Sequence, residues 1–322
     1  MKALTFAAVV VASALVAPAH AQSLTKLTYL TAAPATLPAF APFQIAKHKG
    51  YYRDGGLDVE FVAAKGGADV AKQIGVGNAD LGGGIGDTPI IVRPNGLPVR
   101  GVALLGGGSL TQIVARKDAG INSPADLKGK SVTVLAYQDT TYYALLGVLA
   151  AFNLTKNDVD IQAAGPAGSI QLVAAGKAVA VAGVPERGLA VEFAGVPTTW
   201  FSAGQYFPRM SQAILASEDA IKNKPQMIRS FVLASLKGVR DIMSDPVQAT
   251  KDFIAAAPEN AGKEKEIEAI LLAYNKLVYA GQSELGSFDP ARLKAVQDFY
   301  LKAGIIEKGG PVEDLYTNEF IK

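Results

Sequence analysis

The strongest constraint on the fold is a regular alternation along the chain. From Leu24 onward, short apolar runs rich in β-branched residues alternate with segments of helical periodicity. This alternation is typical of parallel strands joined by crossover helices and predicts an α/β protein. In the first part of the chain it predicts strands at 27–30, 57–62, 79–84 and 99–105 and helices at 40–50, 69–75 and 88–93.

The alternation is interrupted once and later ends. It stops at Gly106-Gly107-Gly108-Ser109 and restarts with strands at 113–115, 131–135, 159–163 and 179–183 and helices at 141–152 and 169–175. After Pro208 a strand at 210–216 is followed only by helical patterns. We therefore expect two doubly wound α/β lobes joined by two crossings, with residues 22–106 plus 208–322 in lobe 1 and 107–207 in lobe 2. Ligands of such folds bind beyond the carboxyl ends of the strands, so a cleft is expected between the lobes.

The first 21 residues read as an export signal. A positive charge at Lys2 precedes an apolar run over residues 3–16 and the small-x-small sequence Ala19-His20-Ala21. A membrane anchor is the alternative, but the run falls short of the roughly 20 apolar residues that a span needs. The chain has no cysteine, so it offers no site for a lipid after cleavage. We expect a periplasmic protein that is not a lipoprotein.

Composition excludes several functions. The formal net charge is only +2 and there is no basic run, which argues against nucleic acid as a partner. Without cysteine, and with His48 as the one histidine beyond the signal, the chain lacks the residues for a metal site or a catalytic triad. Gly129-Lys130-Ser131 is followed by a strand and preceded by Pro124 where a phosphate loop needs glycine. We expect no cofactor, no metal, no enzyme activity and a monomer.

Residues 45–60, IAKHKGYYRDGGLDVE, are similar to the A-x-x-K-G-Y-[FY]-x-x-x-G-L-D-V-[ED] stretch of a known family. This is the family of sulfonate, nitrate, taurine and thiamine-pyrimidine binding proteins of ATP-driven importers. Residues 86–89 (GDTP), 126–130 (DLKGK) and 140–146 (TTYYALL) resemble further family motifs. The resemblance implies a type II periplasmic-binding-protein fold that closes about a hinge on a small molecule. It implies as partners a membrane permease of an ABC importer and its cytoplasmic ATPase.

The chain departs from the family in one region. Family members often carry an aspartate and then a tryptophan near a W-[EA]-P run, whereas this chain has Val179 and then Val184-Pro185-Glu186. A differently shaped, roomier pocket is expected. Fungal pyrimidine-precursor synthases share the fold and are the enzymatic alternative, but they use a cysteine-rich segment and histidine chemistry that this chain lacks.

Helix starts and charged side chains suggest the ligand chemistry. Helix starts after Pro38, Thr88, Thr140 and Gly168 should face the cleft, where free N–H groups can hold an anion. The alternative is that Thr88, Thr140 and Ser169 only cap their helices. Arg209, beside the second crossing, is the predicted partner of a carboxylate or sulfonate. Arg187 is a weaker candidate for the same role and is expected at the surface.

Three acids and four aromatic residues complete the predicted site. Asp87, Asp139 and Glu186 can bind an amine or heterocyclic N–H, or be solvated loop charges. Phe40, Tyr137, Tyr142 and Tyr206 can stack on a planar ligand or form the pocket wall, with a core role as the alternative for Phe40 and Tyr142. The predicted ligand is a small organic anion or zwitterion, sulfonate-like, taurine-like or an aromatic carboxylate, with a pyrimidine or thiamine precursor as the alternative.

The predicted ligand-binding set lies in the strand-to-helix loops and at the crossings. Its members are Thr36, Pro38, Phe40, Gly86, Asp87, Thr88, Ser109, Tyr137, Asp139, Thr140, Thr141, Tyr142, Val184, Pro185, Glu186, Tyr206 and Arg209.

Overall fold

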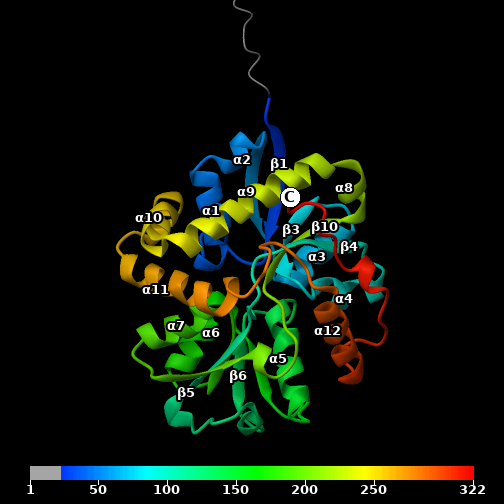
Figure 1. The fold of residues 1–322 in the computed structure, drawn as a ribbon. Helices are drawn as coiled ribbons and strands as arrows, with labels where there is room; N and C mark the ends of the chain where they lie inside the picture. Colours follow the sequence, from blue (N-terminus) through cyan, green and yellow to red (C-terminus); the bar gives the residue numbers. More distant parts are fainter. Residues whose placement is uncertain (1–22) are drawn as a thin grey trace, which may run out of the picture.

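The computed structural model describes residues 23–322, so the predicted export signal lies outside the described residues. The described chain folds around two five-stranded sheets, one above the other in Figure 1. The predicted fold class is confirmed: two mixed α/β lobes are joined by two crossings.

The sheet of lobe 1 has the order β2-β1-β3-β10-β4. Strands β1, β2 and β3 are parallel, whereas β10 is antiparallel to both β3 and β4. The strands are β1 (Thr25–Thr31), β2 (Leu57–Ala63), β3 (Leu81–Ile85), β4 (Val99–Leu104) and β10 (Gln212–Ser217). Strand β10 thus returns from lobe 2 to the middle of this sheet and ties the two halves of lobe 1 together.

The sheet of lobe 2 has the order β7-β6-β8-β5-β9. Strand β6 is parallel to β7 and β8, and β5 is antiparallel to β8 and β9. The strands are β5 (Gln112–Arg116), β6 (Ser131–Val134), β7 (Asp160–Ala163), β8 (Ala180–Gly183) and β9 (Thr198–Ser202).

Helices cover both sheets. Those that follow strands of lobe 1 are α1 (Ala41–His48), α2 (Tyr51–Asp54), α3 (Gly67–Gly75) and α4 (Thr88–Val92), with the short turn η1 (Pro38–Phe40) before α1. Those of lobe 2 are α5 (Thr140–Ala151), α6 (Gly165–Ala174) and α7 (Pro185–Phe193). The C-terminal series is α8 (Glu218–Asn223), α9 (Pro225–Ser244), α10 (Pro246–Ala256), α11 (Glu264–Tyr274), the π-helical turn η7 (Asn275–Tyr279) and α12 (Pro290–Lys302). The remaining short turns are η2 (Arg93–Asn95), η3 (Lys117–Ala119), η4 (Pro124–Leu127), η5 (Ala203–Gln205), η6 (Pro258–Asn260) and η8 (Val312–Asp314).

Several of these elements start at side-chain caps that the sequence indicates. Ser123 and Asp126 form a capping box, and Asp245 and Asp289 accept backbone N–H groups at the starts of α10 and α12. Such caps satisfy N–H groups that have no partner within the helix.

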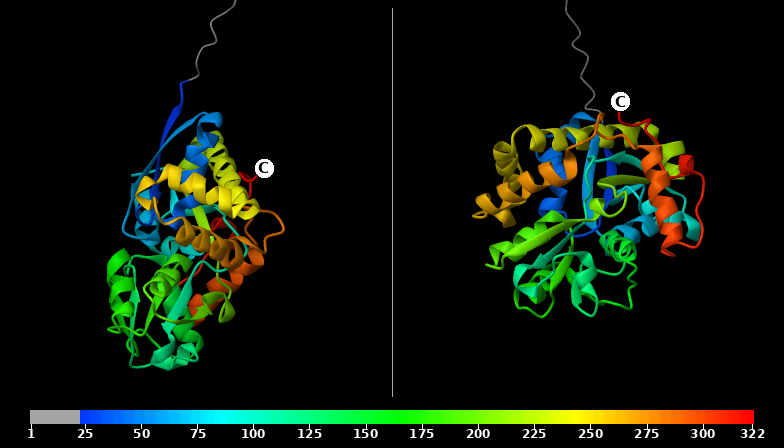
Figure 2. Two further views of the ribbon diagram at one scale, coloured as in Figure 1. Left: turned by 90° about the vertical axis from the view of Figure 1, so that its left-hand side faces the viewer. Right: turned by 60° about the horizontal axis from the view of Figure 1, so that its bottom comes forward.

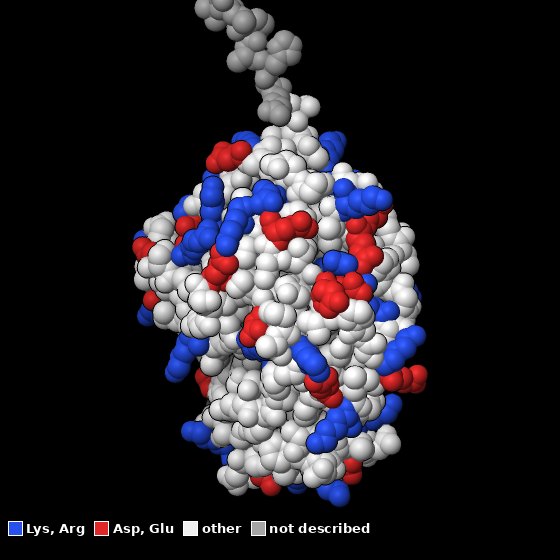
Figure 3. All heavy atoms as spheres, turned by 45° about the vertical axis from the view of Figure 1, so that its right-hand side comes forward, with Lys and Arg blue, Asp and Glu red and all other residues white. Residues whose placement is uncertain are grey.

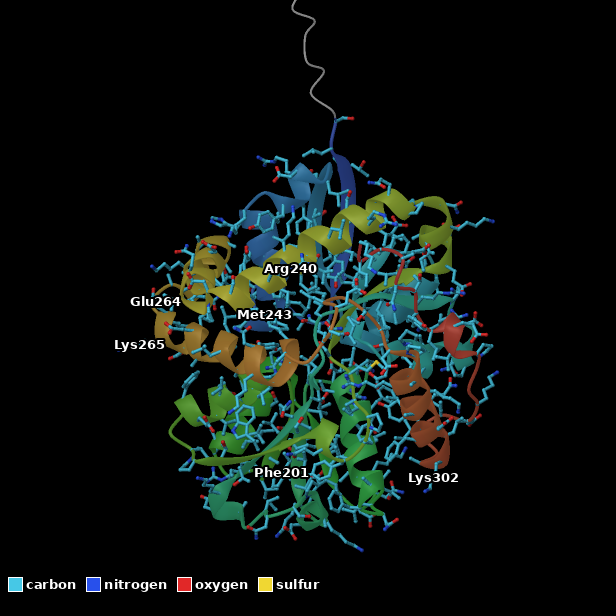
Figure 4. The ribbon with its side chains drawn as sticks, in the orientation of Figure 1. Phe201, Arg240, Met243, Glu264, Lys265 and Lys302 are labelled. Atoms are coloured by element: carbon cyan, nitrogen blue, oxygen red, sulfur yellow. The ribbon has the colours of Figure 1, made fainter. Side chains whose placement is uncertain are left out.

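The C-terminal helices do more than cover lobe 1, which was their expected role. Helices α9 and α10 pack on α1, but α11 packs against α7 of lobe 2. Helix α12 runs down beside lobe 2, where Lys302 marks its lower end in Figure 4. Near that end Phe299 stacks on Phe207 of the second crossing, which joins β9 to β10, with ring centroids 4.6 Å apart. The two lobes are therefore linked by helix contacts as well as by the crossings (Figure 2).

The first crossing, residues 105–111, lies against η7. The backbone N–H groups of Gly107 and Gly108 donate to the carbonyls of Ala280 and Val278, at 3.0 and 2.9 Å. Gly106 has φ +143°, and a Cβ atom there would lie 2.1 Å from the Val278 carbonyl oxygen. The close approach of η7 therefore requires glycine in this crossing.

Basic and acidic side chains are interspersed on the face shown in Figure 3, so that face carries no large patch of one charge. Within residues 23–322, no helix is long and apolar enough to cross a membrane. In the same residues no three His, Cys, Asp or Glu side chains group as metal ligands would.

Candidate ligand cleft

A cleft opens between the lobes at the carboxyl ends of the strands. It encloses about 570 Å³ when its opening to solvent is counted. Both lobes line it, with side chains and backbone of Ala32, Ala33, Leu37, Ala39, Phe40, Gly83, Gly84, Ile85 and Gln212 from lobe 1, Leu110 from the first crossing, and Leu135, Asp139, Thr140, Thr141, Gly183, Val184, Glu186 and Arg187 from lobe 2. Most of this wall is apolar, with few polar groups, as in sites for small organic molecules.

The lobes touch across the cleft. The Ala39 N–H of lobe 1 donates to Glu186 Oε2 of lobe 2 at 2.7 Å. At another point the Ala68 N–H donates to the Gln138 carbonyl at 3.1 Å. The backbone approaches so closely there that a Cβ atom on Gly66 would lie 2.7 Å from the Asp139 Cα. These contacts describe a closed arrangement of the two lobes.

Glu186 is the central acid of the cleft. It lies in the first turn of α7, is 7% exposed and meets lobe 1 through Ala39. Burial raises the pKa of its carboxyl above the ordinary value, although Arg187 and the Ala39 N–H both act to lower it. The phenols of Tyr274 and Tyr279 are also buried, and the charge of Glu186 helps to raise the pKa of each. Glu186 thus lies at a desolvated contact between α7 and the α11–η7 segment.

The raised pKa of Glu186 predicts a pH effect on closure. The closed form binds a proton on this carboxyl more readily than a form in which the carboxyl is solvated. The stability of the closed form therefore rises as the pH falls from the raised pKa to the ordinary glutamate pKa. Above the raised pKa the carboxyl is charged, and the closed form is destabilised by the full cost of burying that charge. As the pH falls from about 8 to about 5, the Tm of the unliganded protein should rise relative to the Tm of Glu186→Gln at the same pH. Parallel curves for the two proteins would contradict this.

Asp139 is the second acid of the cleft wall. It is the N-cap of α5, and its Oδ1 accepts the Thr141 N–H at 2.9 Å and the Thr141 hydroxyl. Its side chain is 5% exposed. Asp139 therefore places negative charge on the helix end that was expected to receive a ligand anion.

Other helix starts also have a carboxylate of the protein beside them. Glu186 takes an N–H group just before α1, and Asp87, the N-cap residue of α4, is fully buried. Helix α6, which begins at Gly165 rather than after Gly168, has no side-chain cap. Three of the four helix starts predicted to attract an anion thus already have a carboxylate of the protein beside them.

Arg209 lies away from the cleft wall, contrary to its expected role. It is fully buried, and its Nη1 donates to the Asp87 carboxylate and to the Tyr300 hydroxyl. The guanidinium also stands 5.5 Å from the Phe207 ring centroid. Arg209 and Asp87 are paired with each other under α12, and neither of them lines the cleft.

The structure brings six residues of the predicted set together in the cleft wall: Phe40, Asp139, Thr140, Thr141, Val184 and Glu186. The others lie outside the wall. Thr36 and Pro38 precede α1, Pro185 starts α7, and Gly86 packs on Leu104 and Met210. Thr88 accepts the Ile85 N–H, and the Ser109 hydroxyl donates to the Thr111 carbonyl. Tyr137 is 49% exposed and donates to the Ile161 carbonyl, Tyr142 lines a separate groove with Ala303, and Tyr206 packs edge-on to Phe152.

Sequence reasoning missed three polar or backbone features of the wall. Arg187 lines the cleft at 6% exposure, with Nη1 donating to the Pro166 carbonyl at 2.5 Å, rather than lying at the surface. Gly83 and Gly84 contribute bare backbone, and Gln212 contributes an amide. The signal for the glycines was present in the run at 82–84, which is unusual for a buried strand.

A protein-family model described as NMT1/THI5 like matches residues 37–249, which include every cleft-lining residue except Ala32 and Ala33. The chain belongs to the NMT1/THI5-like family. Among curated relatives of this NMT1/THI5-like protein, the riboflavin-binding protein RibY of Chloroflexus aurantiacus is 26% identical over 88% of this chain and 82% of its own. The 4-amino-5-hydroxymethyl-2-methylpyrimidine phosphate synthase of Aspergillus parasiticus is 24% identical over 73% of this chain and 72% of its own.

Solved structures share the fold of this NMT1/THI5-like protein at low identity. The alkanesulfonate-binding protein SsuA of Xanthomonas axonopodis pv. citri, bound to MOPS, aligns with TM-score 0.72 and 18% identity over 91% of this chain and 98% of its own. The periplasmic nitrate-binding protein NrtA of Synechocystis aligns with TM-score 0.69 and 14% identity over 91% and 86%. These likenesses establish the fold of a solute-binding protein.

Proposed function

We propose that this protein is the solute-binding component of an ATP-driven importer in the periplasm. It captures a small organic molecule by closure of the two lobes and passes it to a membrane permease coupled to a cytoplasmic ATPase. The observation that carries the proposal is the bond from the Ala39 N–H to Glu186, which joins the lobes over a cleft that both of them line. A ligand in that cleft stabilises the closed form by contacts with both lobes, which is what ligand-driven closure requires.

The charges of the cleft favour a ligand that donates hydrogen bonds. Two buried carboxylates, Asp139 and Glu186, face one guanidinium, Arg187, in a wall that is otherwise mostly apolar. A sulfonate or nitrate ion would meet carboxylates at the helix ends that could otherwise hold it. A neutral or zwitterionic heterocycle with N–H or O–H groups fits better. Riboflavin and aminopyrimidines, named in the relatives, both contain a pyrimidine-type ring with such donors.

We favour binding over catalysis for the same cleft. Its lining contains no histidine, lysine or cysteine, the side chains on which most nucleophilic and proton-transfer chemistry depends. The histidine that the structure describes, His48, lies at the end of α1 and is exposed.

A thermal-shift series tests the proposal. The mature chain is heated alone and with riboflavin, 4-amino-5-hydroxymethyl-2-methylpyrimidine, taurine, MOPS or nitrate. A ligand at 100 times its dissociation constant stabilises the folded state by about 2.7 kcal/mol, so a true ligand produces a clear rise in Tm. We expect a rise in Tm with at least one of the two heterocycles and none with taurine, MOPS or nitrate.

Small-angle scattering on the same samples separates binding from closure. A ligand that raises Tm should also reduce the radius of gyration relative to any open unliganded population. A rise in Tm with taurine or MOPS alone would contradict the ligand class while supporting solute binding. Chemical conversion of a bound pyrimidine, detected by mass spectrometry, would favour the synthase alternative.

A further inference from the structure

Gln212 is the first residue of β10, where the chain re-enters lobe 1 after the second crossing. Its Cα is paired with that of Ile85 at the carboxyl end of β3, and both residues line the cleft. The Gln212 carbonyl accepts the Leu105 N–H at 2.7 Å, at the start of the first crossing. Its backbone is therefore held by the sheet on one side and by the crossing on the other, which fixes where the side chain starts.

The Gln212 side chain has an unused polar atom. It is 4% exposed, and its Oε1 has no hydrogen-bond partner in the part of the chain that the structure describes. Buried side-chain atoms without a partner also occur in Tyr29, Asp87, Thr111, Ser131, Arg209, Tyr274, Asn275 and Tyr279. Of all these residues within 23–322, only Gln212 lines the cleft.

An unpaired carbonyl oxygen in a buried site is costly unless a partner arrives. In the closed cleft the ligand is the partner that can arrive, because the neighbouring wall residues Ile85, Gly84 and Leu110 offer backbone or apolar surface. The amide also carries an NH₂ donor beside its acceptor. A glutamine amide can therefore pair with a ring edge that presents a donor next to an acceptor, as it does with adenine in nucleic-acid recognition.

We propose that the Gln212 amide recognises a heterocyclic ligand by hydrogen bonding to a ring edge that presents a donor next to an acceptor. This inference rests on the proposed function and narrows its ligand class. A flavin has this pattern, because its N3–H donates and the adjacent C4=O accepts. An aminopyrimidine has it too, because its N3 accepts and the adjacent 4-amino group donates. Glu186 and Asp139, which each already accept a hydrogen bond from the protein, can accept further N–H or O–H donors of the same molecule. An inorganic anion has no donor and leaves the Gln212 oxygen unpaired.

The test uses pairs of probes that differ only at this edge. One pair is riboflavin and 3-methylriboflavin; the other is 4-amino-5-hydroxymethyl-2-methylpyrimidine and its 4-dimethylamino analogue. Calorimetry on the full mature chain is expected to show that the unmethylated member of at least one pair binds roughly tenfold tighter. In Gln212→Met, which keeps the length of the side chain without its amide, that ratio should fall to near one.

Two further variants make the result specific. Gln297→Met removes a buried amide of α12 that is hydrogen bonded to Gly310, away from the cleft, and should keep the wild-type ratio. Gln212→Glu keeps an acceptor oxygen at position 212 and should keep discrimination against the 3-methyl flavin at reduced affinity. If Gln212→Met does not fold, the flavin pair measured on Gln212→Glu tests the role of the acceptor oxygen by itself.

The outcomes separate this inference from the function on which it rests. A wild-type ratio in Gln212→Met, or loss of discrimination in Gln212→Glu for the flavin pair, would overturn the role of Gln212 and leave the proposed function standing. Failure of the wild-type protein to bind any of the four probes would overturn the heterocyclic ligand class and this inference with it.

Discussion

Replacing Arg209 by methionine is expected to lower the free energy of unfolding by about 3–5 kcal/mol. The substitution leaves the Asp87 carboxylate in a fully buried position without its ion-pair partner, and the neutral Tyr300 hydroxyl is the side-chain donor that remains to it. An uncompensated buried charge is among the few causes of such large losses. Urea unfolding followed by circular dichroism measures the change through the transition midpoint.

The double variant Asp87→Leu with Arg209→Met is the control. Removing both charges replaces the ion pair by apolar groups of similar size, so most of the lost stability should return. A single Arg209→Met variant that is as stable as the wild type yet fails to bind ligand would mean that Arg209 reaches the ligand after all, as its position beside the crossing first suggested.

Gly238→Ala is expected to destabilise the protein by about 1–3 kcal/mol, although alanine is the better helix former. Gly238 lies inside α9 where that helix crosses α1, and a Cβ atom there would stand 2.1 Å from the Pro42 carbonyl oxygen. Since that oxygen belongs to the backbone of α1, the two helices must move apart. Because α1 follows the loop that carries Ala39, the displacement should also weaken ligand binding.

Gly310→Ala is the matched control, because a Cβ atom there has no neighbour within 4 Å. It should leave the midpoint of thermal unfolding nearly unchanged. A Gly238→Ala variant that is more stable than the wild type would show that helix propensity outweighs the contact with Pro42 and would contradict the packing described for α9.

The fold could be predicted because its signals are local. Short apolar runs mark the strands, and caps such as Asp245 and Asp289 mark helix starts within one or two residues. What local patterns did not reveal was the reach of the C-terminal helices. The apolar faces of α11 and α12 show that they need a partner, but not that α7 and the second crossing share that role with lobe 1.

The site was harder to predict because burial decides which polar groups are free. Asp87 and Arg209 stand at suitable loops, but their pairing depends on Tyr300, which is 213 residues from Asp87 along the chain. Gln212 begins a short apolar strand and has the appearance of an ordinary core position in the sequence. Glu186 was expected in a loop, whereas Val184 and Pro185 start helix α7 and place it in the first helical turn.

The contacts of the first crossing locate the axis of lobe movement. Gly107 and Gly108 are hydrogen bonded to Ala280, just after η7, and to Val278 within η7, and the Arg292 side chain of α12 donates to the Gly107 carbonyl at 2.6 Å. We therefore expect those residues to move with lobe 1, and lobe 2 to rotate about the few residues between Gly108 and β5 and the matching stretch before β10. A hinge that short would favour rotation of the lobes over sliding of one past the other.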